Sequence, residues 1–111
     1  MGKTTRKTAL KESDIQRLIM LALSEAGCLI FRNNVGTLKN AAGIPIKFGL
    51  CVGSSDLIGI APGGRFLAVE IKTSKGRATP EQMRFIEAVR ARGGVAGIAR
   101  SPAEALALLA Q

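Results

Sequence analysis

The middle of the chain reads Asp56-Leu57-Ile58-Gly59-Ile60-Ala61-Pro62-Gly63-Gly64-Arg65-Phe66-Leu67-Ala68-Val69-Glu70-Ile71-Lys72. Two apolar runs on either side of a Pro-Gly-Gly turn are typical of two antiparallel strands joined as a hairpin. Asp56 begins the first of these strands and Glu70 stands near the end of the second. The hairpin therefore predicts that both carboxylates lie at the same end of the pair.

Asp56 and Glu70, placed together, suit the binding of a divalent cation. Carboxylate oxygens are ligands that hard divalent cations prefer. Lys72 follows Glu70 by two residues, so its side chain is expected on the same face of the strand, because side chains alternate along a strand. Two carboxylates and an ammonium at one sheet edge are the groups required for metal-assisted hydrolysis of a phosphodiester.

The overall charge indicates an anionic partner. The 111 residues include 16 Lys and Arg against 8 Asp and Glu, a net charge of +8, which favours nucleic acid. Charge alone leaves open a basic protein with an unrelated function. The chain length and its apolar content suit one domain with one core. No apolar run approaches the roughly 20 residues needed to span a bilayer, so no membrane partner is expected.

Two residue types narrow the chemistry further. The chain has no histidine, which excludes Ser-His-Asp triads and ordinary zinc sites. Cys28 and Cys51 do not form a CxxC pair, and their apolar neighbours predict buried free thiols. Free thiols fit a reducing cytoplasm.

Periodicity and capping signals predict the remaining elements. Residues 1–10 are expected to form a basic flexible arm and 11–111 a single domain. An apolar stripe predicts a helix over 13–26, and Gly27 ends it. Thr79 is expected to cap a second helix, with Pro80 at its first position and Gln82 completing a capping box. The other predictions are strands over 28–32 and 95–99, a long loop over 33–53 with a short hairpin around 37–46, and a last helix over 103–110.

Several motifs along this order resemble those of the PD-(D/E)xK nuclease superfamily, and within it the VRR-NUC (virus-type replication-repair nuclease) domain. The motifs are Glu12-Ser13-Asp14-Ile15-Gln16, Gly53-Ser54-Ser55-Asp56-Leu57, Glu70-Ile71-Lys72, Thr79-Pro80-Glu81-Gln82 and Gly93-Gly94-Val95. Ser55 stands where the superfamily name has proline. The resemblance implies an α/β, restriction-endonuclease-like core of order α-β-β-β-α-β-α, with a mixed central sheet flanked by helices.

The resemblance also implies roles for individual residues. Asp56, Glu70, the Ile71 carbonyl and Glu12 would hold Mg²⁺ or Mn²⁺, and Lys72 would orient the attacking water. Gln16 and Gln82 would support the site. Each role has a structural alternative. In these alternatives Asp56 only caps a turn, Lys72 only neutralises the acids and Glu12 complements the helix dipole, while Gln16 is solvated and Gln82 only caps its helix.

Basic residues outside these motifs are candidates for phosphate contacts, although a solvated loop explains any one of them equally well. They are Arg32, Lys39, Lys47, Lys75, Arg77 and Arg84. Stand-alone VRR-NUC proteins are similar to Holliday-junction resolvases. The resemblance therefore implies a bacterial or phage-encoded homodimer that cuts branched DNA. The alternatives are a general DNA nuclease and a non-catalytic nucleic-acid-binding module. The apolar stripe of the last helix, with Ala105, Leu106, Leu108 and Leu109, suits either the core or a dimer surface.

Overall fold

The central sheet is built around the predicted hairpin. In the computed structural model, which describes residues 10–111, β4 (Leu57–Ile60) and β5 (Phe66–Ile71) pair antiparallel with Leu57 opposite Val69. Gly63 and Gly64 take positive φ angles in the turn between them, a conformation that glycine adopts without a steric penalty. The expected arm over 1–10 lies, apart from Leu10, outside the described residues.

Two further strands complete a four-stranded sheet of order β1-β4-β5-β6. β1 (Leu29–Arg32) runs antiparallel to β4, and β6 (Val95–Ala99) runs parallel to β5. The parallel pair requires a crossover, which α2 (Pro80–Ala91) provides. The sheet is therefore mixed, as predicted.

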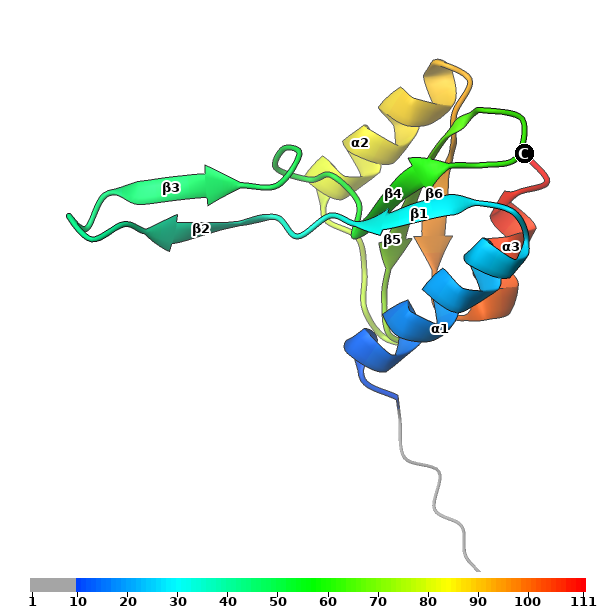
Figure 1. Ribbon diagram of the computed structural model, residues 1–111, viewed down its shortest axis with the longest axis horizontal. Helices are drawn as coiled ribbons and strands as arrows, with labels where there is room; N and C mark the ends of the chain where they lie inside the picture. The colour runs from blue at the N-terminus through cyan, green and yellow to red at the C-terminus, as the bar shows by residue number, and fades with distance from the viewer. Residues whose placement is uncertain (1–9) are drawn as a thin grey trace, which may run out of the picture.

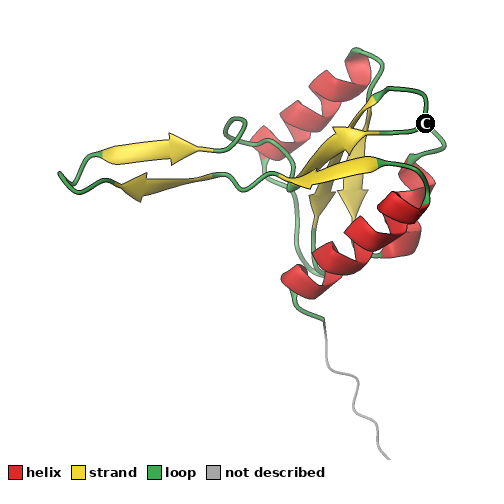
Figure 2. Ribbon diagram, in the orientation of Figure 1, coloured by secondary structure: helices red, strands yellow, loops and turns green. Residues whose placement is uncertain are grey.

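Helices cover the sheet from both sides (Figures 1 and 2). α1 (Glu12–Glu25) and α3 (Pro102–Leu108) pack on the face formed by Leu67, Val69 and Ile71, and α2 packs on the alternate residues, including Ala68. Because neighbouring side chains on a strand point to opposite faces, Glu70 lies on the α2 side together with Ala68. The predicted α/β fold and its element order are confirmed.

The helix ends follow the predicted capping signals closely. Thr79 caps α2: its hydroxyl accepts from the Gln82 amide N–H, and the Gln82 side chain accepts from the Thr79 N–H in return. Gly27 takes a positive φ just after the end of α1. α3 ends at Leu108, two residues before the predicted end. The predicted capping box is confirmed.

The segment between β1 and β4 forms a second, smaller sheet. β2 (Gly36–Lys39) and β3 (Pro45–Phe48) pair antiparallel as a hairpin that projects from the body of the molecule (Figure 1). This confirms the short hairpin expected around 37–46 and extends it by a residue or two at each end.

The structure shows which of the two cysteines and which apolar residues of α3 are buried. Cys28 is buried, but Cys51 is exposed, because it lies in the loop after β3 and not in a strand of the core. In α3, Ala105 is fully buried and Leu108 and Leu109 pack against the core, whereas Leu106 stays exposed. The stripe of α3 is therefore mainly core. Across residues 10–111, no helix is long and apolar enough to cross a bilayer.

Candidate active site

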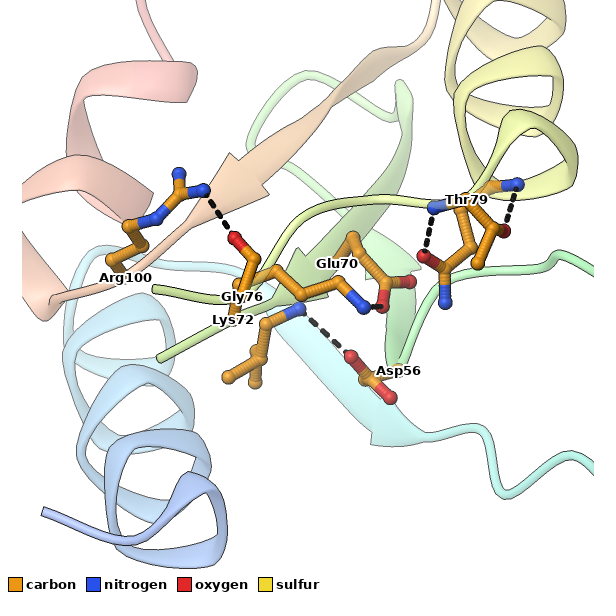
Figure 3. A network of polar contacts seen from close by, with 8 residues as sticks. Asp56, Glu70, Lys72, Gly76, Thr79 and Arg100 are labelled. Atoms are coloured by element: carbon orange, nitrogen blue, oxygen red, sulfur yellow. Dashed lines mark hydrogen bonds and ion pairs between the residues drawn. The ribbon is translucent and has the colours of Figure 1, made fainter. Parts of the chain in front are cut away.

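Asp56 and Glu70 meet at one end of the β4–β5 hairpin, as the hairpin register requires. Asp56 directly precedes Leu57, which pairs with Val69, so Glu70 is the next residue on the opposite strand. Asp56 Oδ2 accepts a hydrogen bond of 2.8 Å from the Ile71 N–H, which fixes one carboxylate oxygen against the partner strand (Figure 3). Asp56 is half-buried and Glu70 is 2% exposed.

Lys72 reaches the same place from the end of β5. Its Nζ lies 3.4 Å from Glu70 Oε2, an ion pair that Figure 3 shows beside Asp56. The two side chains therefore share one face of the chain, as the two-residue spacing predicts. The pair leaves Glu70 Oε1 buried, with no hydrogen-bond partner among the described residues.

The electrostatics of Glu70 follow from this placement. Burial and the neighbouring Asp56 carboxylate raise the pKa of Glu70 to about 7, while Lys72 acts in the opposite direction. A buried, unpartnered carboxylate oxygen beside a second carboxylate is costly without a cation. A divalent cation between the two acids would satisfy the free oxygen and offset their repulsion. The arrangement fits a hard metal ion held by Asp56, Glu70 and the Ile71 carbonyl.

Glu12 is the third acidic residue predicted for the site. It occupies the first turn of α1 and is exposed, where its charge also complements the helix dipole. Within residues 10–111, no three or more Asp, Glu, Cys or His side chains are grouped closely enough to hold a metal. The protein groups that fit the ion are thus two carboxylates and a backbone carbonyl, and Glu12 as a further ligand stays a prediction.

A hollow of about 570 Å³ opens beside Asp56. Gln16 of α1 and Gln82 of α2 both line it, together with Asp56. Gln82 therefore caps α2 and borders the site at the same time, so its two predicted roles are compatible. Gln16 is half-buried and lines this hollow, and its supporting role stays a prediction.

Comparison with known proteins shows the family to which this chain belongs. The sequence profile of the VRR-NUC domain matches residues 10–103. The chain belongs to the VRR-NUC family. VRR-NUC is a nuclease family, so the domain is that of an enzyme that hydrolyses phosphodiester bonds. VRR-NUC nucleases typically use a metal.

Solved structures show the same VRR-NUC fold. One, described as "VRR_NUC domain", has a TM-score of 0.62 at 23% identity and covers 90% of this chain and 95% of its own. Another, a "VRR_NUC domain protein", has a TM-score of 0.60 at 24% identity, covering 94% of this chain and 88% of its own. At these identities the similarity concerns the fold. No functionally curated protein matches the sequence significantly.

Sequence reasoning missed Asn33, which holds the loop that carries Asp56 in this VRR-NUC domain. Asn33 is 9% exposed, and its Nδ2 donates to Ser54 Oγ at 2.7 Å and to the Ser55 carbonyl at 2.9 Å. Its Oδ1 accepts from the Leu50 N–H at 3.1 Å, and its backbone N–H donates to the Asp56 carbonyl at 2.7 Å. These partners are remote in sequence, and the only local signal was a polar residue after an apolar strand.

The six basic residues proposed for phosphate contacts are all exposed. Lys39 and Lys47 lie on the projecting hairpin, and Arg32 ends β1 at its base. Lys75 and Arg77 follow Lys72 in the loop before α2. Within the described chain only Arg84 of the six has an ion-pair partner, Glu81 at 3.8 Å. Five cations of the VRR-NUC domain are thus available to an anion.

Proposed function

We propose that this VRR-NUC protein is a Mg²⁺-dependent endodeoxyribonuclease, with Mn²⁺ able to replace Mg²⁺. One observation supports this most directly: Oε1 of Glu70 is buried beside Asp56 and Lys72 and has no hydrogen-bond partner within residues 10–111. A module that only bound phosphate would gain nothing from two carboxylates held close together.

Asp56, Glu70 and the Ile71 carbonyl are proposed to hold the ion, with Glu12 contributing directly or through water. A bound ion lowers the pKa of its water and neutralises charge on the phosphate. The protein's own contribution is orientation and charge. The Lys72 ammonium is proposed to orient the attacking water and to stabilise the charge that builds on the phosphate.

Gln16 and Gln82 border the Asp56 hollow, one from each side of the sheet, and are proposed to position the substrate or a water there. Arg32, Lys39, Lys47, Lys75, Arg77 and Arg84 are proposed to contact DNA phosphates. Phe is the sole aromatic residue type in the chain, so platforms on which single-stranded bases stack are scarce. Recognition of a duplex or junction backbone fits this composition better.

The preferred substrate is proposed to be branched DNA, a four-way junction, cut by a homodimer. Two sites are needed to cut two strands symmetrically, and a homodimer provides them. The cleavage product would carry a 5′-phosphate, as the family resemblance implies.

A labelled four-way junction and a linear duplex of the same arm sequence, each incubated with the protein and Mg²⁺, test this proposal. Paired symmetric nicks in the junction alone, absent with Glu70→Gln, are the expected result. Equal cutting of both substrates would contradict junction specificity and indicate a general DNA nuclease. Tight binding without any cutting would contradict catalysis and indicate a binding module.

A further inference from the structure

The projecting hairpin has two chemically different faces. Leu38 lies opposite Ile46 and Gly36 opposite Phe48, while Thr37 lies opposite Lys47. Directly paired residues share a face of a sheet, and successive residues alternate. A Cβ added to Gly36 would lie 2.7 Å from the Phe48 ring, which places the ring over Gly36 on the first face. One face is therefore apolar, and the other carries Lys39 and Lys47.

The apolar face of the hairpin is uncovered. Leu38 is 67% exposed and Ile46 is 49% exposed. Within residues 10–111, β2 and β3 make their extensive contacts only with each other. A two-stranded hairpin is marginally stable by itself in water, so this one gains stability from a surface that covers its apolar face.

The central sheet offers an uncovered apolar surface as well. Leu29 pairs with Ile60 and Ile60 with Phe66, and all three are at least 41% exposed, as is Phe31 beside them. Phe31 pairs with Ile58, which pairs with Ala68, so all three residues lie on the same face of the sheet. This is the face on which α2 packs, against Ala68. α2 covers β5 and β6 but leaves β1 and β4 bare on that side.

A groove continues this bare surface along α2. It measures about 540 Å³, and its lining includes the apolar side chains of Phe66, Phe85, Val89 and Leu50 together with Arg65 and Arg92. Eleven of the fifteen large apolar side chains that are exposed in the described chain lie either on the 33–53 segment or on this bare face of the sheet. Exposed apolar surface of this extent marks an interface.

We infer that a second copy of this chain covers both surfaces, with the apolar face of each hairpin lying on the bare face of the partner's β1 and β4 and on the groove beside it. The two surfaces occur on one chain, and Figure 1 shows the hairpin pointing away from the sheet, so one molecule does not bring them together. A two-fold symmetric dimer brings them together twice, because the hairpin of each copy then lies on the sheet of its partner.

The apolar face of the hairpin suits a protein surface better than DNA. Each copy has a net charge of +8, so two copies repel, and an interface between them must be held by uncharged contacts. Leu38, Ile46 and Phe48 provide such contacts and no phosphate-binding group. The lysines of the opposite face stay free for DNA.

This inference rests on the homodimer that the proposed function includes. Dimerisation of the variants Leu38→Lys and Thr37→Lys, measured in the absence of DNA, tests it. Both variants add the same charge one residue apart, on opposite faces of the hairpin. Analytical ultracentrifugation over a range of concentrations should show a wild-type dimer. The dimer dissociation constant should rise about 100-fold or more in Leu38→Lys, because the two-fold repeats the change in both copies, and stay unchanged in Thr37→Lys.

Ile60→Lys, on the receiving face, should weaken the dimer as Leu38→Lys does, with circular dichroism and thermal melts confirming that each variant is folded. A monomeric wild type, equal effects of the two hairpin variants, or a folded Ile60→Lys that dimerises normally would each overturn the inference. These measurements use the protein alone. Loss of nuclease activity in every form would contradict the proposed function and leave the interface standing.

Discussion

Glu70 combines three features that rarely occur together by chance: near-complete burial, a carboxylate neighbour and an oxygen without a partner. The sequence alone indicated the first two, because a Glu among Val69 and Ile71 interrupts an apolar strand and the hairpin places Asp56 opposite it. The free oxygen depends on where Lys72 points, which no pattern reveals.

The raised pKa of Glu70 predicts how stability depends on pH and metal. Between its ordinary value of 4.5 and about 7, Glu70 is protonated in the folded protein but ionised in the unfolded chain. The folded state then binds more protons, so the metal-free protein loses stability as the pH rises through this range, by about 1 to 3 kcal/mol in all. Glu70→Gln should remove this loss, as thermal melts in EDTA from pH 4 to 8.5 would reveal.

Mg²⁺ should act in the opposite direction, because the ion competes with the proton for Glu70. We expect added Mg²⁺ to raise the melting temperature of the wild type more at pH 8 than at pH 6, and to leave Glu70→Gln unchanged at both. A wild type whose melting temperature does not respond to Mg²⁺ at pH 8 would count against a metal at this carboxylate.

Asn33 should act through the position of Asp56. Asn33→Ala leaves the Leu50 N–H and the Ser55 carbonyl without their partner, at a cost of about 2 kcal/mol. Cleavage should slow by about tenfold or more even at temperatures where the variant is folded, since a shifted Asp56 misplaces the reacting groups. Single-turnover rates compared with Asn34→Ala, an exposed neighbour lining the same hollow, provide the measurement. Equal rates for the two variants would contradict the positioning role.

At the scale of elements, local chemistry predicts most of this fold. The Pro-Gly-Gly turn, the capping box at Thr79 and the apolar stripe of α1 each depend on neighbouring residues, and all three were recognisable. The orientation of the 33–53 segment was not, because the bonds that anchor it join Asn33 to residues 17 to 22 positions away. Cys51 was misplaced for the same reason: apolar neighbours do not reveal whether a loop folds onto the core.

Gln82 is predicted to have two roles, one in capping α2 and one in the active site. Thr79→Ala and Gln82→Ala should each destabilise α2 by about 1 kcal/mol, because either change breaks the capping box. Only Gln82→Ala should also slow cleavage, because only Gln82 lines the Asp56 hollow. Melting temperatures and cleavage rates measured together separate the two effects. If Thr79→Ala slows cleavage as much, Gln82 acts through the helix alone.

For the whole molecule, the excess of positive charge predicts opposite responses to salt. DNA binding should weaken by about 10³-fold between 50 and 200 mM salt if all six proposed cations contact phosphates. The apolar dimer should not weaken, because salt screens the repulsion between its copies. Replacing Lys39 and Lys47 by Ala should reduce the slope of log K against log salt by about two and leave the dimer intact. An unchanged slope would remove the hairpin from the DNA surface.

The proposed nuclease activity depends on Asp56, Glu70 and Lys72 forming a metal-dependent phosphodiesterase site. The rate of four-way-junction cleavage, measured against Mg²⁺ concentration for the wild type and Glu70→Gln, tests this most directly. We predict that the wild-type rate rises with Mg²⁺ and saturates, that EDTA abolishes it, and that Glu70→Gln stays inactive while folded and bound to DNA. Cleavage that persists in EDTA, or that proceeds at the wild-type rate in Glu70→Gln, would contradict it.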